Sequence, residues 1–285
     1  MNPMSTPQDI TVPGALAPVF VPAPAPAESS ILPVLGVPVT DVPMEHALGL
    51  LQNMLYEQPR RAHSVYFVNT HTLNNACDNP AYREVLRSAD RVFGDGTGVR
   101  WAARILHGVT LQDNVNGTDL VPLMFQRWAN QGLRYFLLGN TPERIEIAAR
   151  RAQEMFPGWT LAGYHTGYLG PDDHQAVIAK INASGADLML VGMGNPKQEQ
   201  WIHDHLDQLN VPLCLATGGL FDYWVGDLVR APRWVRKLGY EWLHLLSRQP
   251  HKAGRYLIGN PKFLGRVFRS WVMRHDKRND RKRRT

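Results

Sequence analysis

A buried strand that runs directly into a glycine turn constrains the fold of this chain most. Leu188 to Val191 is a short apolar run, which is typical of a strand covered on both faces of a parallel sheet. Gly192 and Gly194 follow, and glycines let the backbone turn sharply and let a ligand approach it closely. The stretch therefore predicts a buried strand whose carboxyl end meets a ligand.

The residues after this turn predict the start of a helix. Asn195 is a good N-cap, Pro196 suits the first helical position, and Gln198 lies three residues after the cap. The free N–H groups and positive dipole end of such a helix suit an anion such as a diphosphate. An ordinary tight connection between strand and helix is the structural alternative, since this turn is shorter than a full phosphate-binding fingerprint.

The same strand and helix alternation recurs along the chain. Strands alternating with helices of this length predict an α/β fold, a Rossmann-like and mostly parallel sheet with helices on both faces. The expected strands are 35–39, 64–68, 91–93, 134–138, 160–164, 188–191 and 213–216, and the expected helices are 43–56, 80–88, 99–106, 116–131, 142–155, 171–184 and one ending near 209.

Composition divides the chain into three parts. Residues 1–33 are rich in Pro and Ala and predict a disordered leader. Residues 34–227 carry the strand and helix pattern and predict one α/β domain. Residues 228–285 are rich in Trp and Arg, contain no predicted strand, and predict a basic helical appendage that faces a membrane.

Composition also bounds the compartment. The two cysteines, Cys77 and Cys214, lie in different segments and have no metal-ligand spacing, which favours a reduced, cytoplasmic protein. No apolar run approaches the roughly 18–20 residues of a spanning helix, and no basic segment followed by an apolar core marks a secretory signal. We therefore expect a cytoplasmic protein.

Small and polar residues follow five of the predicted strands, and the carboxyl ends of parallel strands share one crevice. These ends are 69–71, 94–98, 139–140, 192–195 and 217–219. In that crevice a partly desolvated Asp95 is a candidate general base, and His71 could orient a ligand or carry a proton. The structural alternatives are a turn aspartate and a structural histidine. Gln198, Glu199 and Asp222 open helices, so capping and dipole compensation are their alternative roles.

The C-terminal segment predicts a basic amphipathic helix with aromatic residues, which suits an anionic membrane surface. Packing against the domain or a solvated tail are the alternatives, and no nucleic-acid recognition motif accompanies the charge. The apolar positions are Phe263, Leu264, Val267, Phe268, Trp271 and Val272, and the interleaved cations are Arg266, Arg269 and Arg274.

Eight motifs occur in an order that resembles the WecG/TagA/CpsF glycosyltransferase family over about Ile31 to Phe268. They are Phe93-Gly-Asp-Gly-Thr-Gly-Val99, Asn116-Gly-Thr-Asp-Leu120, Phe136-Leu-Leu-Gly139, Gly192-Met-Gly-Asn-Pro-Lys-Gln-Glu199, Gly218-Gly-Leu-Phe-Asp222, Arg230-Ala-Pro-Arg-Trp234, Glu241-Trp242 and Arg255-Tyr256. The resemblance implies inverting transfer of a sugar from a UDP-sugar to a polyprenyl-diphosphate-linked saccharide, at the cytoplasmic face of the membrane. It implies exopolysaccharide or cell-surface polysaccharide biosynthesis, without a bound metal or other cofactor. It also implies that residues 34–227 form the nucleotide-sugar-binding catalytic domain of a protein that is peripheral on the inner face of the membrane.

The resemblance also implies roles for particular residues. Asp95 would be the base that takes the proton of the acceptor hydroxyl. Asn69 and His71 occupy the place where the family often has Thr-x-Asn, a variant seen in members thought to act in exopolysaccharide assembly, and His71 would hold the sugar or position the acceptor. N-acetylmannosamine, its uronic acid, glucose or another hexose stay open as donor sugars. The implied UDP contacts are Gly192, Gly194, Pro196, Lys197, Gln198 and Glu199, and the other implied substrate contacts are Gly96, Asn116, Gly139, Gly218, Asp222 and Arg230.

The appendage of the family closes over the active site and supplies arginines to the diphosphate. Arg255 matches one such position, and Lys252 stands where an arginine is common. The arginine usual four residues after the Glu-Trp glutamate is absent, since Leu245 is there, and Arg248 is a candidate substitute from the next turn.

Two other functions remain open from the residues. A nucleotide-cofactor oxidoreductase on a doubly wound sheet lacks its expected GxGxxG after the first strand. A membrane scaffold would bind a nucleotide sugar without turnover. The sequence leaves the oligomeric state, including a homo-oligomer, undecided.

Overall fold

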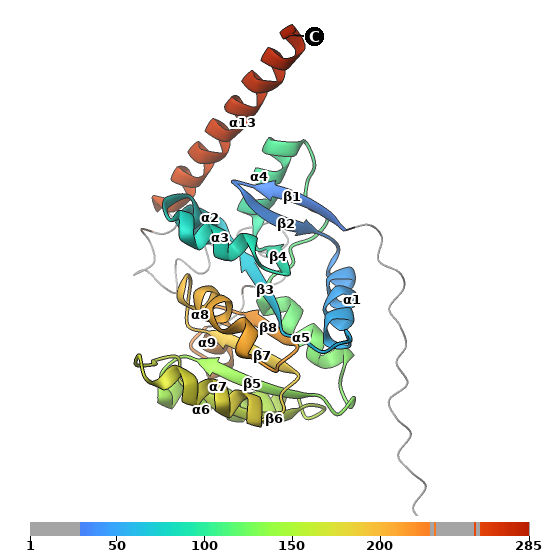
Figure 1. Ribbon diagram of the computed structural model, residues 1–285, viewed down its shortest axis with the longest axis vertical. Helices are drawn as coiled ribbons and strands as arrows, with labels where there is room; N and C mark the ends of the chain where they lie inside the picture. The colour runs from blue at the N-terminus through green and yellow to red at the C-terminus, as the bar shows by residue number, and fades with distance from the viewer. Residues whose placement is uncertain (1–28, 229–230, 232–253, 255–256, 285) are drawn as a thin grey trace, which may run out of the picture.

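A single sheet of eight strands forms the centre of the molecule in the computed structural model, which describes residues 29–228, 231, 254 and 257–284 (Figure 1). The strand order is β1-β2-β4-β3-β8-β7-β5-β6; β1 pairs with β2 antiparallel and every other pair is parallel. The strands are β1 Ser30–Val34, β2 Val37–Asp41, β3 His63–Val68, β4 Arg91–Gly94, β5 Arg134–Gly139, β6 Thr160–His165, β7 Leu188–Gly192 and β8 Leu213–Ala216. The predicted α/β fold with a mostly parallel sheet is confirmed.

Helices cover both faces of this sheet. One face packs against α2 Thr70–Asp78, α3 Pro80–Arg87, α4 Thr97–His107, α7 Asp173–Ala183, α8 Lys197–His205 and α13 Gly259–Arg284, and a short 3-10 helix Leu206–Gln208 follows α8. The other face packs against α1 Met44–Leu55, α5 Gly117–Arg127, α6 Pro142–Met155 and α9 Leu220–Val225. Because both faces are covered, every residue of β3 and β8 is buried, which explains their continuous apolar character.

The first two strands form a hairpin at one edge of the sheet. Leu35 and Gly36 both have positive φ, 50° and 87°, and make its two-residue turn. The expected strand 35–39 is therefore wrong at its start, because these two residues are needed for the turn. The expected domain start at residue 34 also falls inside the hairpin, since β1 begins at Ser30.

The long C-terminal helix α13 lies against α2 and α4 with one of its sides. Phe263 and Val267 are fully buried there, and Arg266 donates hydrogen bonds to the backbone oxygen and Oδ1 of Asn74 at 2.8 and 3.0 Å. Packing against the domain, which was one of the alternatives for this segment, therefore holds for these two residues, because they complete the core of the domain.

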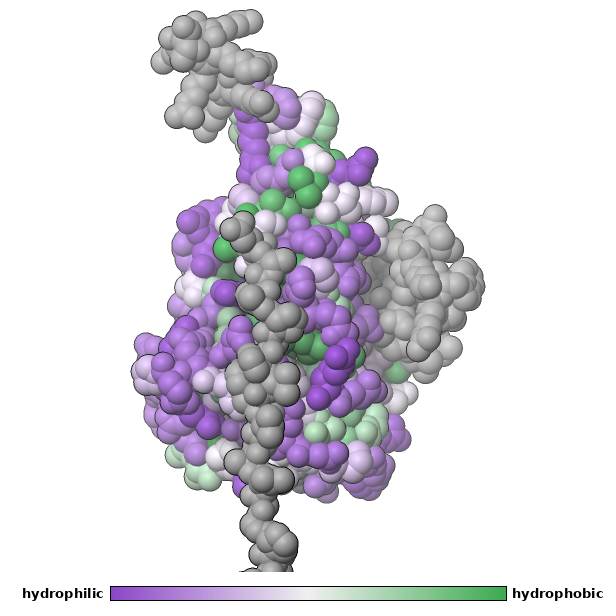
Figure 2. Space-filling model, turned by 90° about the vertical axis from the view of Figure 1, so that its right-hand side faces the viewer, coloured by the Kyte–Doolittle hydropathy of each residue, from purple (hydrophilic) through white to green (hydrophobic). Residues whose placement is uncertain are grey.

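The other side of α13 carries exposed apolar residues. Phe268 is 61% exposed and Met273 is 48% exposed. Figure 2 shows a mostly hydrophilic face with hydrophobic residues gathered towards the upper end of the molecule, at the level of α4 and α13 in Figure 1. Among the described residues, none of the helices combines the length and the hydropathy needed to cross a membrane.

Candidate active site

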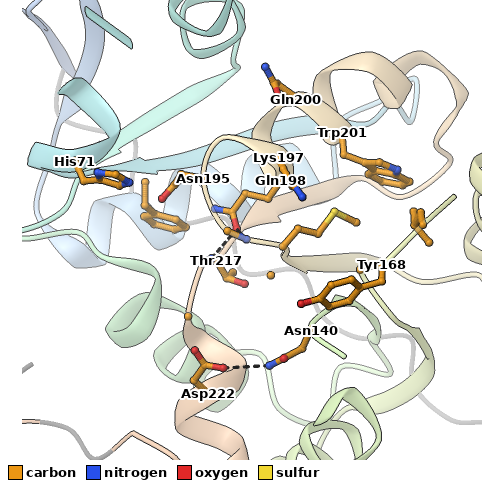
Figure 3. Close-up of a pocket in the computed structure, with 18 of the residues that line it drawn as sticks. His71, Asn140, Tyr168, Asn195, Lys197, Gln198, Gln200, Trp201, Thr217 and Asp222 are labelled. Atoms are coloured by element: carbon orange, nitrogen blue, oxygen red, sulfur yellow. Dashed lines mark hydrogen bonds between the residues drawn. The ribbon is translucent and has the colours of Figure 1, made fainter. Parts of the chain in front are cut away.

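A cavity of about 1080 Å³ lies beyond the carboxyl ends of the parallel strands (Figure 3). Segments that follow β3, β4, β5, β6, β7 and β8 contribute to its lining, as expected where neighbouring strands end at the same edge of a sheet. The predicted site residues that line it are Asn69, His71, Asp95, Asn116, Gly192, Gly194, Lys197, Gln198, Gly218 and Asp222.

The remaining predicted residues do not line the cavity or lie outside the described part of the chain. Gly96 and Pro196 adjoin lining residues, Gly139 packs against the turn after β7, and Glu199 is buried. Those outside the described residues are Arg230, Lys252 and Arg255, together with Leu245 and Arg248.

The turn after β4 places Asp95 at the cavity. The Asp95 N–H donates to Val68 O at 2.8 Å, which joins the ends of β4 and β3. Gly96 has a φ of 95°, and its N–H donates to Asn114 Oδ1 at 2.5 Å. The backbone on both sides of the Asp95 carboxyl group is thus held by hydrogen bonds, so a rigid turn presents this side chain to the cavity.

Asn69 and His71 belong to a helix start and not to the loop that we expected. Asn69 Oδ1 accepts hydrogen bonds from the N–H groups of His71 and Thr72 at 3.1 and 3.2 Å, so Asn69 is the N-cap of α2. His71 lies in the first turn of α2 and lines the cavity, with its Nε2 3.4 Å from Asn75 Nδ2. The Asn-Thr pair was the available signal for this cap.

Asn116 is 3% exposed and serves as the N-cap of α5. Its Oδ1 accepts from the Asp119 N–H at 2.9 Å, and its Nδ2 donates to Asp119 Oδ2 at 2.8 Å. This reciprocal pair orients the start of α5, where Thr118 also lines the cavity.

The turn between β7 and α8 differs from the prediction. The helix begins at Lys197, and Asn195 does not cap it, because the Asn195 Nδ2 donates to the carboxylate of Glu199. Gln198 Oε1 accepts from the N–H groups of Gly194 and Gly218, both at 3.1 Å. The Gln198 amide thereby ties the turn after β7 to the turn after β8, and these two glycine N–H groups are occupied by a side chain.

Glu199 lies in the first turn of α8, as predicted, but it is fully buried and does not line the cavity. Gln198 Nε2 donates to its Oε1 at 2.8 Å. Burial raises its pKa from 4.5 to about 7, against the lowering effect of hydrogen bonds such as that from Gln198. Within the described part of the chain, its Oε2 and the Tyr82 hydroxyl are both buried without a hydrogen bond of normal geometry, although each group affects the pKa of the other. The available signal in the sequence was the apolar Ile202, which lies three residues after Glu199 and therefore on the same face of the helix. Ile202 is also buried.

Asp222 lies in the first turn of α9 at another part of the cavity. Its Oδ1 accepts from Asn140 Nδ2 at 3.1 Å (Figure 3). The same oxygen accepts from an Arg144 terminal nitrogen at 2.9 Å. Sequence reasoning did not identify Arg144, because it lies on α6, one turn beyond the expected crevice residues.

The segment after β6 was also missed, although Gly167 and Gly170 follow this strand and line the cavity, and these glycines were the available signal. It brings Tyr168, which is 73% exposed, to the rim of the cavity, together with His174 from α7. Trp201 of α8 donates from its Nε1 to His174 Nδ1 at 3.1 Å. The rim therefore combines planar aromatic rings with polar groups, a lining suited to a nucleoside or a sugar.

Both positively and negatively charged side chains line the cavity. Lys197 brings a cation at the N-terminus of α8, where the helix dipole adds partial positive charge. Asp95 and Asp222 bring carboxylates, but in the described part of the chain no three His, Cys, Asp or Glu side chains gather in an arrangement that could hold a metal ion.

A comparison with known protein families finds one family for most of this chain. The model of the glycosyl transferase WecG/TagA/CpsF family matches residues 32–277, which is most of the chain. The matched range includes every strand of the sheet except the first two residues of β1, and all the residues that line the cavity. The chain therefore belongs to the WecG/TagA/CpsF family of glycosyl transferases.

Proposed function

We propose that this glycosyltransferase moves a hexose from a UDP-sugar to a polyprenyl-diphosphate-linked saccharide, with inversion at the anomeric carbon, during exopolysaccharide or cell-surface polysaccharide biosynthesis. The observation that carries the proposal is the position of Asp95. Asp95 lines the same cavity as Lys197 and the Gly194 turn, so a candidate base and the positive start of a helix share one cavity.

The proposed reaction is a direct displacement. Asp95 takes the proton of the acceptor hydroxyl while that oxygen attacks the anomeric carbon of the donor sugar. The bond between the anomeric carbon and the diphosphate oxygen breaks on the opposite face, and UDP leaves with the bonding electron pair. Attack from the face opposite the leaving group inverts the anomeric configuration. His71 and Asn69, which line the cavity from the start of α2, hold the sugar or the acceptor.

The departing UDP gains negative charge, which needs stabilisation where it develops. The Lys197 ammonium group and the N-terminus of α8 supply positive charge at the cavity without a metal ion. The Gly194 and Gly218 N–H groups donate to Gln198 Oε1, so we assign Gln198 the role of shaping the diphosphate site rather than leaving these amides for the ligand.

The nucleoside fits the part of the cavity lined by Asn140, Tyr168 and Asp222. A carboxylate at this edge of a doubly wound sheet accepts hydrogen bonds from ribose hydroxyls in other nucleotide-binding proteins. The exposed ring of Tyr168 offers a flat apolar surface to a base.

The exposed side of α13 supports a place at an anionic membrane surface on the cytoplasmic side. Phe268 and Leu264 are 61% and 39% exposed, and Arg269 is exposed beside them. Apolar residues flanked by cations are the pattern of an interfacial helix, and this surface would bring the cavity near a lipid-linked acceptor.

Substitution Asp95→Asn tests the proposal. The full-length protein is incubated with a panel of UDP-sugars and a short-chain polyprenyl-diphosphate sugar, and product mass is measured. We expect the variant to lose at least about 100-fold in kcat with little change in the affinity for UDP, because a general base contributes on that order. Asp207→Asn, an exposed carboxylate outside the cavity, is the matched control and should keep wild-type activity.

Three results would contradict the proposal. Near-wild-type transfer by the Asp95→Asn protein would remove the general-base role. UDP-sugar binding by the wild-type protein without any loss of sugar from the donor would favour the scaffold function. Binding of NADH but not of UDP would favour the oxidoreductase function.

A further inference from the structure

Arg144 makes three separate contacts at one wall of the cavity. Its Nε donates to Asn140 Oδ1 at 3.0 Å, one terminal nitrogen donates to Asp222 Oδ1 at 2.9 Å, and the other terminal nitrogen pairs with Asp227. Asn140 and Asp222 line the cavity, whereas Arg144 does not. All three nitrogens of the guanidinium group are thus used to join two segments, the turn after β5 and the α9 region.

The Asn140 end of this arrangement fixes the loops around the cavity. Asn140 has a φ of 56°, and its N–H donates to Gly192 O at 3.1 Å. Its own carbonyl oxygen accepts from Thr166 Oγ1 at 2.8 Å and from the Gly167 N–H at 3.0 Å. The turns after β5, β6 and β7 therefore meet at Asn140, whose side chain is oriented by Arg144.

The contacts of Arg144 and Asn140 also hold the carboxylate of Asp222 in one orientation. Asp222 Oδ1 accepts hydrogen bonds from Asn140 and from Arg144, so two donors orient the carboxyl group. The Asp222 side chain is 29% exposed, and its backbone oxygen accepts from the Asp227 and Leu228 N–H groups at 3.0 and 3.2 Å. A rigid planar fork can hold such a set of acceptors, whereas a lysine ammonium group on a flexible stem cannot.

We propose that Arg144 is a positioning residue for nucleotide recognition, because it locks Asp222 and Asn140 in the orientation in which Asp222 accepts a hydrogen bond from the ribose of the donor. This inference rests on the proposed function, since it takes UDP as the nucleotide and the part of the cavity near Asp222 as the ribose site. Arg144 touches neither the sugar nor the reacting atoms, so its effect is on the binding of the nucleotide and not on the displacement itself.

The test compares UDP with 2′-deoxy-UDP and 3′-deoxy-UDP, with affinities measured by calorimetry on the full-length protein. The wild-type protein should bind at least one deoxy compound about tenfold more weakly than UDP. Arg144→Met should weaken UDP binding about tenfold and abolish that discrimination, with KM for the UDP-sugar raised and kcat changed less than about threefold. Arg144→Lys should keep only part of the wild-type UDP affinity and of the discrimination against the deoxy compounds. Arg150→Met, an exposed arginine on the same helix, is the control and should match the wild type.

A double-substitution cycle guards against a variant that is merely destabilised. Once Asp222 is replaced in Asp222→Asn, the further change Arg144→Met should cost little additional UDP affinity, because the two residues act as one unit. Full additivity, or an Arg144→Met protein that keeps the wild-type discrimination, would overturn the role of Arg144. A wild-type protein that does not bind UDP would instead overturn the proposed function, so the two failures are distinguishable.

Discussion

Replacing Glu199 by Gln tests how far the interior of the protein perturbs a carboxyl group. Glu199 is fully buried, and burial raises its pKa from 4.5 to about 7. The folded state therefore holds the proton more tightly than the unfolded state. The contribution of this group to stability is most favourable below pH 4.5, and it is lost as the pH rises from 4.5 through about 7.

A rise of this size in the pKa of Glu199 corresponds to a loss of about 3 kcal/mol of unfolding free energy above pH 8, at about 1.4 kcal/mol per pKa unit. Between pH 5 and pH 8.5 the wild-type protein should lose about 2–3 kcal/mol of stability through this group alone. Gln cannot ionise, and its Oε1 can still accept the hydrogen bonds from Asn195 and Gln198. Glu199→Gln should therefore gain stability relative to the wild type as the pH rises.

Urea denaturation at pH 5 and pH 8.5 measures this difference, with the slope m checked for constancy. Glu154→Gln, an exposed glutamate on α6, is the control and should show a difference within about 0.5 kcal/mol of zero at both pH values. If the stability difference between Glu199→Gln and the wild type were the same at pH 5 and pH 8.5, the reasoning about desolvation of Glu199 would be refuted.

Two further outcomes follow from the packing. Gly139→Ala should lower the unfolding free energy, measured by denaturation, by more than about 2 kcal/mol, because an added Cβ would lie 2.3 Å from the backbone oxygen of Gly192 at a φ of 151°. The control Gly265→Ala adds a Cβ to open space in α13 and should raise the unfolding free energy by about 0.5–1 kcal/mol. An unchanged unfolding free energy in Gly139→Ala would contradict the close approach of the two strands. Phe268 is 61% exposed, so Phe268→Asp should reduce co-sedimentation with phosphatidylglycerol vesicles and leave the melting temperature unchanged. Val267 is buried, so the control Val267→Asp should lower the melting temperature. Equal vesicle binding by the wild-type and Phe268→Asp proteins would contradict the role of α13 as the membrane surface.

The order of strands and helices along the chain could be predicted from local sequence patterns. Apolar runs such as Leu188 to Val191, bounded by glycines, predicted the buried strands, because side-chain periodicity and turn residues act over a few positions. The convergence of strand ends, including Asp95 and Gly194, followed from the rule for parallel sheets. The strand order, with β3 beside β8, was beyond such reasoning because it depends on pairings between distant segments.

Individual side chains were harder to place. Gln198 and Glu199 have the same local signature as ordinary first-turn residues of a surface helix, yet one joins two loops and the other is buried. Arg144 likewise has no local signal for its contacts with Asn140, Asp222 and Asp227. Their positions are decided by what packs around them.

By itself, the sequence determined the alternation of strands and helices, the glycine turns and the edge at which functional residues gather, because these depend on periodicity and backbone preference within short segments. Only the tertiary structure decided which carboxylates face the cavity and which are buried, and which side of α13 completes the core. Those outcomes depend on burial and on hydrogen-bond partners that lie many residues away along the chain.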